Sequence, residues 1–184
     1  MTALRKASMR DIPRLLALIN GYAAQGAMLA RTEPELAESI RDFTVAVDDR
    51  DEVLACSALH FYTMATAEVR SLAVDPALKG KGIGRELVEA TEKEAREMGI
   101  SSLFAFTYVP GFFSRLGYGQ VDRGLLPQKA WKDCLRCPKF QCCDEIAMLK
   151  TIGPETLFMP SSTTDAKVLE PELIIIHVPV LLKQ

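Results

Sequence analysis

The sequence predicts an α/β (α+β) fold, in which helices flank a mixed, mostly antiparallel sheet. Two patterns support this prediction. Three β-rich runs follow one another in the first half of the chain, and a strand, a glycine-rich turn, an amphipathic helix and another strand come next. The length of 184 residues fits one domain with a sizeable core, because single domains commonly contain about 100–200 residues.

The N-terminal part of the chain predicts a short strand and two helices. Residues 4–8 can form the strand, and "RDIPRLLALI" then begins a helix that has proline in its first turn and continues towards Tyr22. A second helix is expected from Thr32 to Ile40, because Thr32 is a suitable N-cap and Glu33 and Glu35 favour a first turn.

The central part of the chain predicts most of the sheet. Residues 43–47, 53–62 and 67–74 indicate an antiparallel meander. The following helix, residues 82–98, has an apolar stripe, and residues 103–107 form the next strand. We expect the two strands on either side of this helix to be parallel, as in other strand–helix–strand units.

The C-terminal part is predicted to divide near residue 150. "PGFFSRLGYG" indicates one or two helical turns that end at Gly117, and residues 118–121 and "DEIAMLK" indicate strands. Residues 1–150 are therefore the expected domain, and residues 151–184 are an expected linker and strand-forming tail. The run "LIIIHVPVLLK" needs cover, since a free β-prone edge promotes aggregation. It should pair with this domain's sheet or with a second subunit, and a homodimer is expected.

Charge and hydropathy narrow the classes of function. A formal net charge of −2 gives no general attraction to nucleic acid or to an anionic membrane. No apolar run is long enough to span a bilayer, and the N-terminus lacks the continuous apolar core of a signal peptide. The sequence thus predicts a soluble, cytoplasmic protein with neither nucleic-acid nor membrane partners.

The turn "PALKGKGIGREL", residues 76–87, is the most distinctive local motif. It lacks the Lys-Ser/Thr pair of a P-loop and the third spaced glycine of the dinucleotide fingerprint. Glycines that open a helix still let first-turn N–H groups converge on an anion, and Lys79, Lys81 and Arg85 add positive charge. The alternative is an ordinary strand-to-helix connection with a solvated basic rim.

The residues around this turn resemble a known motif. "VRSLAVDPALKGKGIGRELVEATEKEAREMGI" resembles the acetyl-CoA motif of the GNAT acetyltransferase superfamily, [QR]-x-x-G-x-[GA], with Lys79 where Arg or Gln is usual. "LFAFTYVPGFFSRLGYGQVD" is similar to the strand and helix that follow in that superfamily, and the resemblance covers about residues 4–150. It implies acetyl-CoA as co-substrate, with its pyrophosphate at the turn. The implied contact residues are Leu72, Ala73, Val74, Lys79, Gly80, Lys81, Gly82, Ile83, Gly84 and Arg85.

Two further stretches resemble the short bacterial N-acetylglutamate synthases. These are "MLARTEPELAESIRDFTVAVDDRDEVLACSALHFY" and "GLLPQKAWKDCLRCPKFQCCDEIAM". The resemblance implies transfer of acetyl from acetyl-CoA to the α-amine of L-glutamate in a ternary complex, the first step of arginine biosynthesis. Two alternatives remain open. The acceptor can be another amine of an amino acid, polyamine or protein, or the chain can be a non-catalytic regulatory module that binds acyl-CoA or metal.

The same resemblance assigns roles to individual residues. It implies Glu68 as general base, Thr107 as general acid towards the thiolate, and Arg31 as the group that grips the glutamate α-carboxylate. Tyr108 is an alternative acid. A further substrate arginine is expected near the C-terminal strand but has no clean match in this sequence, and Arg136, Lys129 and Lys139 are candidates on proximity only.

Strand alternation and ordinary surface chemistry bear on these assignments. Period-two alternation puts Glu68, Arg70 and Leu72 on one strand face, so Arg70 could hold a substrate carboxylate or act on the base. Structural alternatives stand beside the functional ones. Glu68 could be a solvated strand-end carboxylate, and Arg31 could form an exposed ion pair with Glu33 or Glu35.

Four cysteines are clustered in "CLRCPKFQCC": Cys134, Cys137, Cys142 and Cys143. Zinc sites usually use hooks from separated segments, and adjacent cysteines fit two tetrahedral corners poorly, so no metal is predicted and structural zinc is not favoured. A local structural role or redox sensing is left open. Cys56 lies in an apolar strand and is predicted to be a core residue.

Overall fold

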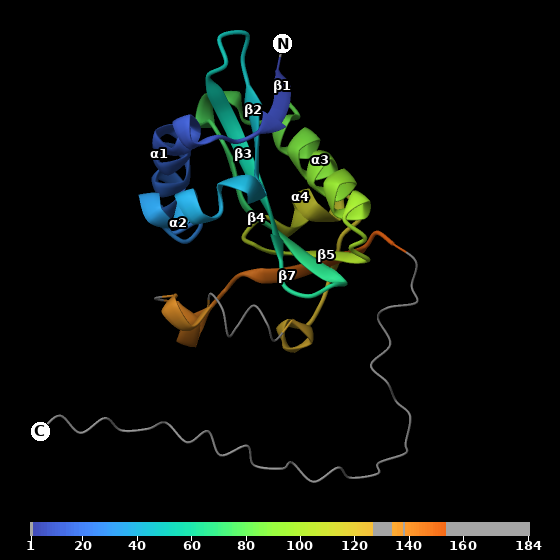
Figure 1. The fold of residues 1–184 in the computed structure, drawn as a ribbon. Coiled ribbons are helices and arrows are strands. Elements are labelled where there is room, and N and C mark those ends of the chain that lie inside the picture. The colour runs from blue at the N-terminus through green and yellow to red at the C-terminus, as the bar shows by residue number, and fades with distance from the viewer. Residues whose placement is uncertain (1, 127–133, 138, 154–184) are drawn as a thin grey trace, which may run out of the picture.

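The fold was analysed in a computed structural model, which describes residues 2–126, 134–137 and 139–153 (Figure 1). The expected C-terminal tail lies outside these residues. The strands are β1 (Ala3–Lys6), β2 (Phe43–Val47), β3 (Val53–Phe61), β4 (Thr66–Val74), β5 (Ser102–Thr107), β6 (Gly119–Gln120) and β7 (Ile146–Thr151). The α-helices are α1 (Ile12–Ala23), α2 (Glu33–Glu38), α3 (Ile83–Glu97) and α4 (Pro110–Ser114). Short 3₁₀ turns are η1 (Met9–Asp11), η2 (Ile40–Asp42), η3 (Pro76–Leu78), η4 (Arg123–Leu125), η5 (Cys134–Arg136) and η6 (Phe140–Cys142).

The described strands form one mixed sheet in the order β1-β2-β3-β4-β5-β7-β6. The β4–β5 pair is parallel and the other described pairs are antiparallel, which confirms the predicted meander and crossover. Element ends differ by a few residues from those predicted. The first strand ends at Lys6 and not at Ser8, because Ser8 donates its N–H and hydroxyl to Asp11 Oδ2 at the start of η1 (2.7 and 2.9 Å).

Helices cover both faces of the sheet (Figure 1). Helices α1 and α2 pack on β2 and β3 through Leu15, Ile19 and Leu36, whereas α3 packs on the opposite face through Leu87 and Val88. The second predicted helix is divided into α2 and η2. Its start agrees with the capping expectation, since Thr32 accepts from the Glu35 N–H and Glu35 Oε2 accepts from the Thr32 N–H.

A β-bulge in β4 corrects the predicted alternation. The register with β3 shifts between Cys56 and Ala58, and Ser71 on β4 has a φ of 52°. Leu72 therefore packs with Val69 against the α3 side. Alternation had placed Leu72 on the same face as Glu68 and Arg70, and that prediction was wrong because the extra residue reverses the side-chain order after the bulge.

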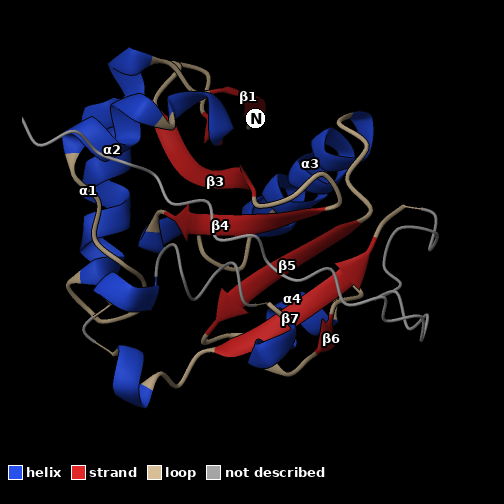
Figure 2. Ribbon diagram, turned by 60° about the horizontal axis from the view of Figure 1, so that its bottom comes forward, coloured by secondary structure: helices blue, strands red, loops and turns tan. Residues whose placement is uncertain are grey.

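Strands β4 and β5 stay together over only three residue pairs. Thr66, Ala67 and Glu68 pair with Ser102, Leu103 and Phe104, and the parallel register then ends. Figure 2 shows the two strands side by side at their starts and separated towards their C-terminal ends. The β5-facing backbone of residues 69–74 is thus not taken up by β5, and a gap opens within the sheet.

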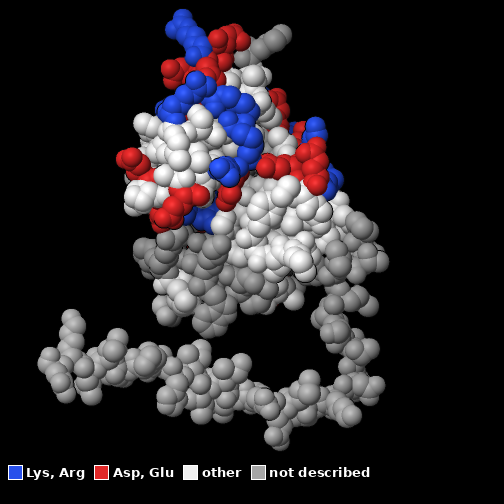
Figure 3. Space-filling model, viewed as in Figure 1, with Lys and Arg blue, Asp and Glu red and all other residues white. Residues whose placement is uncertain are grey.

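Ion pairs fasten the N-terminal strand and helix to the rest of the fold. Arg5 of β1 donates to both carboxylate oxygens of Asp11 (2.8 and 2.9 Å), which is buried at the start of α1. Asp51 accepts from Arg5 and Arg10 in a more exposed position. Figure 3 shows Lys and Arg side chains close to Asp and Glu side chains on the face of the molecule that is seen in Figure 1. In the described part of the chain, no helix combines the length and the apolar character that a membrane span requires.

Candidate active site

A cavity of about 1470 Å³ lies where β4 and β5 diverge. Its wall is assembled from the end of α1 and the loop to α2, from β4, from the first turn of α3, from the end of β5 with α4, and from the η5–η6 segment. These segments are far apart in sequence. They meet around the space that the separation of β4 and β5 opens within the sheet. The cavity is large enough for an extended ligand and a second, smaller one.

The N-terminus of α3 forms one end of this cavity. Gly82 precedes the helix with a φ of 89°, Gly80 has a φ of 81°, and no side chain caps the first turn. The Glu86 N–H, 3.1 Å from the Gly82 carbonyl oxygen, is the first donor of the helical ladder. The N–H groups of the three residues before it thus have no intrahelical acceptor, and together with the positive helix end they are suited to bind an anion.

Most of the predicted cofactor residues line this end. Leu72, Val74, Lys79, Gly80, Gly82, Ile83, Gly84 and Arg85 are in the cavity wall. Ala73 is 1% exposed and packs in the core, and Lys81 is exposed outside the described wall. Lys79 is held by a contact that sequence reasoning missed, since its ammonium lies 4.8 Å from the ring centroid of Tyr22.

Tyr22 also connects α1 to β4. Its hydroxyl donates to the Val74 carbonyl oxygen at 2.6 Å, and its side chain lines the cavity. Gly84 lies on the neighbouring wall, where an added Cβ would meet Val74 Cγ2 at 3.6 Å and the Phe112 ring at 3.7 Å. A single sequence offers no local signal for these contacts because each joins segments that are distant along the chain.

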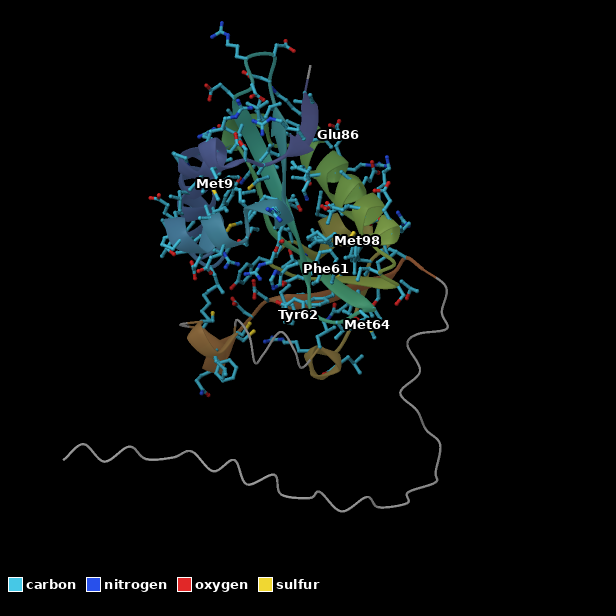
Figure 4. All side chains as sticks on the ribbon, in the orientation of Figure 1. Met9, Phe61, Tyr62, Met64, Glu86 and Met98 are labelled. Atoms are coloured by element: carbon cyan, nitrogen blue, oxygen red, sulfur yellow. The ribbon has the colours of Figure 1, made fainter. Side chains whose placement is uncertain are left out.

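Glu68 lies at the point where β4 and β5 separate. Its side chain is buried, with 2% exposure, and lines the cavity. It is paired with Phe104 of β5 and with His60 of β3. Tyr62, which follows β3 (Figure 4), donates its hydroxyl to Glu68 Oε2 at 2.9 Å. The interpretation of Glu68 as a solvated strand-end carboxylate was therefore wrong. Sequence reasoning also missed Tyr62 as the partner of this carboxylate.

Thr107 and Tyr108 end β5 beside the same gap. Thr107 is 6% exposed, and its Oγ1 accepts the Val109 N–H at 3.0 Å, so its own hydroxyl proton can still be donated. The Tyr108 hydroxyl accepts from Lys139 Nζ at 3.1 Å. Burial raises the pKa of Tyr108, so this phenol is protonated at neutral pH and can act as a donor. Both side chains line the cavity.

Arg31 and Arg70 bring positive charge to the part of the cavity wall that lies outside the glycine turn and α3. The backbone of Arg31 is clamped by Asn20, which accepts the Arg31 N–H at 2.8 Å and donates to its carbonyl oxygen at 2.9 Å. Both arginines line the cavity, as does Glu35, whose carboxylate accepts from the α2 cap. The asparagine clamp explains how a loop residue is held towards the cavity.

The C-terminal basic candidates differ in what the structure describes. Lys139 lines the cavity, and the phenolic oxygen of Tyr108 raises the pKa of its ammonium. Arg136 lies in η5, but its side chain is outside the part of the chain that the structure describes. Lys129 lies outside the described residues. Of these three candidates, Lys139 is therefore the one whose side chain the structure places.

Three clustered cysteines also reach the cavity wall. They are Cys134, Cys137 and Cys143, whereas Cys142 is exposed. Within residues 2–126, 134–137 and 139–153, no group of three His, Cys, Asp or Glu side chains is arranged to hold a metal ion. Cys56 is fully buried as predicted, and burial raises the pKa of its thiol to about 12.

The site thus combines a splayed mixed sheet, an uncapped helix N-terminus that suits an anionic group, and a buried carboxylate. The chain belongs to the GNAT acetyltransferases: residues 12–118 match the family described as "Acetyltransferase (GNAT) family". An uncharacterized N-acetyltransferase of Chlorobaculum tepidum is 45% identical over 151 residues, which cover 82% of this chain and 97% of that protein. An amino-acid acetyltransferase of Mycobacterium tuberculosis is 32% identical over 121 residues, covering 65% and 69% of the two chains.

Two solved structures share the fold and were determined with CoA. One is a Mycobacterium tuberculosis protein with a TM-score of 0.71 and 26% identity, covering 81% of this chain and 98% of that chain. The other is N-acetylglutamate synthase of Neisseria gonorrhoeae, complexed with coenzyme A and N-acetyl-glutamate, with a TM-score of 0.75 and 27% identity. The match covers 84% of this chain but only 36% of the synthase. The protein is an acetyltransferase, and acetyl-CoA is its co-substrate.

Proposed function

We propose that the protein transfers the acetyl group of acetyl-CoA to the α-amine of L-glutamate, the opening step of arginine biosynthesis. One observation carries the proposal: a buried carboxylate, Glu68, and the cations of Arg31 and Lys139 line the cavity that ends at the anion-binding turn of α3. This arrangement suits an acceptor that is an amine and an acid at once. The neisserial synthase and the mycobacterial amino-acid acetyltransferase named above support the same acceptor class.

The donor binds through backbone groups in this proposal. The pyrophosphate of acetyl-CoA lies against the first-turn N–H groups of α3, with Lys79 and Arg85 nearby. The pantetheine chain then extends into the gap between β4 and β5, along the part of β4 that does not pair with β5. This path brings the thioester towards Glu68, at the narrow end of the gap, and towards Thr107, at the C-terminal end of β5.

The chemical step is a direct transfer without an acetyl-enzyme. Glu68, directly or through water, takes a proton from the glutamate ammonium, because only the neutral amine can attack the thioester carbonyl carbon. The new C–N bond gives a tetrahedral intermediate, whose oxyanion needs a donor such as a β4 backbone N–H near the bulge. The C–S bond then breaks, and Thr107 or Tyr108 gives a proton to the leaving thiolate.

Recognition of glutamate requires cations for its carboxylates. Arg31 binds the α-carboxylate in the proposal, because its backbone is fixed by Asn20 and its side chain lines the cavity. For the side-chain carboxylate the proposal uses Arg70 and Lys139, and Lys139 also pairs with Asp144 at 3.5 Å. An arginine can meet a carboxylate with two parallel hydrogen bonds, which gives both affinity and orientation.

The decisive experiment measures thiol release from acetyl-CoA by the full-length protein with a panel of amines. L-Glutamate should give the highest kcat/KM, and γ-aminobutyrate, its decarboxylated analogue, should be at least about 10-fold poorer because it lacks the α-carboxylate. Arg31→Gln should remove most of that preference, whereas Arg10→Gln, which is exposed near β1, should not change it. Faster transfer to a polyamine or to a peptide amine would reassign the acceptor.

A binding measurement separates an enzyme from a regulatory module. Calorimetry with coenzyme A should show binding, and the same preparation should turn over acetyl-CoA only when an amine is present. Binding without turnover for every amine in the panel would contradict the proposed reaction. The homodimer and the domain boundary near residue 150 are further proposals, and light scattering of the full chain and of a chain shortened after residue 153 tests both.

A further inference from the structure

Cys134 and Cys137 occupy the two ends of one tight turn in the cavity wall. The Cys137 N–H donates to the Cys134 carbonyl oxygen at 3.0 Å, which closes the 3₁₀ turn η5. Both residues are partly buried, and both line the cavity that contains Glu68. The acetyl-transfer mechanism uses neither of them.

The turn geometry suits a disulfide. In a 3₁₀ turn the side chains of residues i and i+3 eclipse, and three steps of about 2 Å separate their Cα atoms by roughly 6 Å. That separation lies within the usual range for a disulfide, about 4.4–6.8 Å. The neighbours Cys142 and Cys143 do not suit a bridge, because consecutive Cα atoms are only about 3.8 Å apart. Of these two pairs that are close in sequence, Cys134 and Cys137 are thus the favoured one.

The same turn is connected to the acceptor side of the site. The Cys137 carbonyl oxygen accepts the Phe140 N–H at 3.0 Å, and Lys139 between them reaches the Tyr108 hydroxyl. A bridge holds its Cβ atoms about 3.5–4.5 Å apart, so forming it restricts the conformation of the turn just before Lys139. The donor end at α3 belongs to a different wall of the cavity.

We propose that Cys134 and Cys137 form a reversible disulfide, and that this modification weakens binding of the amine acceptor. With a low-molecular-weight disulfide as oxidant, one cysteine thiolate forms a mixed disulfide and releases one small thiol. The second cysteine thiolate then attacks that mixed disulfide, forms the Cys134–Cys137 bond and releases the second small thiol. The two protein thiols lose two electrons and two protons, and the oxidant becomes two thiols. The effect on the acceptor rests on the proposed function, whereas the bond itself does not.

Peptide mapping tests the bond. The full-length protein is incubated with glutathione disulfide or with dithiothreitol, alkylated, and cleaved with trypsin, which separates the cysteines onto residues 133–136, 137–139 and 140–150. A cross-link between the first two peptides after oxidation, absent after reduction, is expected. A bridge to residues 140–150, free thiols throughout, or stoichiometric zinc that protects these thiols would overturn the proposal.

Kinetics test the consequence with whichever amine the panel identifies. Oxidation should raise the KM of that amine at least about threefold and leave the KM of acetyl-CoA unchanged. Cys134→Ser with Cys137→Ser should abolish the response to oxidant, and Cys142→Ser should retain it. An equal rise in both KM values, or a response that survives the double substitution, would overturn the assignment. If no amine reacts, the proposed function is wrong, and peptide mapping still shows whether the Cys134–Cys137 disulfide forms.

Discussion

The two ends of the cavity are built in different ways. The end that we propose for acetyl-CoA, the donor end, consists of one continuous segment, the end of β4, the glycine turn and the start of α3, and it offers mainly backbone N–H groups. The end that we propose for the amine, the acceptor end, consists of side chains from four distant places: Arg31, Glu68, Thr107 and Lys139. A backbone site is fixed by local conformation, whereas a side-chain site depends on how the elements pack. Substitutions at the two ends should therefore have separable effects on the two substrates.

The largest expected effect is at Glu68 on the acceptor side. Glu68→Gln keeps the shape and the hydrogen bond from Tyr62 but removes the base, so kcat should fall about 10²–10⁴-fold. Calorimetric affinity for coenzyme A should stay within about twofold of the original, because this carboxylate is not part of the backbone site. Glu97→Gln, an exposed change on α3, is the control for loss of one charge. A Glu68→Gln protein with full activity would contradict the proposed base.

The next expected effect separates the two candidate acids at the end of β5. Thr107→Val and Tyr108→Phe each remove one hydroxyl. The substitution that removes the true proton donor should lower kcat about 10–100-fold. We expect Thr107→Val to have the larger effect, because the Tyr108 hydroxyl already interacts with Lys139. A thioester with a more acidic leaving thiol should restore the rate of the impaired variant. If neither variant shows this restoration, neither hydroxyl is the acid.

A smaller effect is expected at the donor end. Gly82→Ala places a Cβ on a residue whose φ is 89°, a conformation that costs an ordinary residue roughly 1–2 kcal/mol. The first turn of α3 should shift, so the KM of acetyl-CoA should rise about 10-fold while that of the amine changes little. Gly21→Ala is a matched control, because Gly21 is helical and has open space at its Cβ position. Equal effects on both substrates would argue against two separable ends.

The smallest effect on the site is expected from the ion pair that holds α1. Arg5 and the hydrogen bonds from Ser8 hold the pKa of Asp11 well below its ordinary value. Because the folded-state pKa is lowered, the ionised carboxylate stabilises the fold above the unfolded-state pKa of about 4 and loses this contribution as the pH falls below it. Asp11→Asn should reduce the free energy of unfolding by about 2 kcal/mol at pH 7. The difference from the original protein should shrink at pH 3.

Urea titrations at the two pH values provide this measurement. Asp51→Asn is the matched control, since Asp51 is 44% exposed and pairs with two arginines at the surface. It should change the free energy of unfolding by less than about 1 kcal/mol. KM values of both substrates should be unaffected by either change. If Asp11→Asn lowers the free energy of unfolding as much at pH 3 as at pH 7, the electrostatic explanation is refuted.

Much of the fold was predictable because its signals are local. The meander, the α3 helix and the parallel β4–β5 pair follow from periodicity and from the glycine turn, and the structure confirms them. The alternation of β4 failed at Leu72, because one extra residue at Ser71 reverses the faces and leaves no mark in the residue pattern. The partnership of Tyr62 with Glu68 was also invisible, since it joins two strands across a turn.

The sequence by itself determined the glycine turn and helix start that we propose as the donor end of this acetyltransferase. Glycines of positive φ and an uncapped helix start lie next to one another in the chain, and local sterics and backbone polarity suffice to form an anion site. Only the tertiary structure decided the acceptor end. Strands β4 and β5 separate after three pairs, and that separation, which depends on packing across the whole sheet, brings residues near positions 31, 68, 107 and 139 around one cavity.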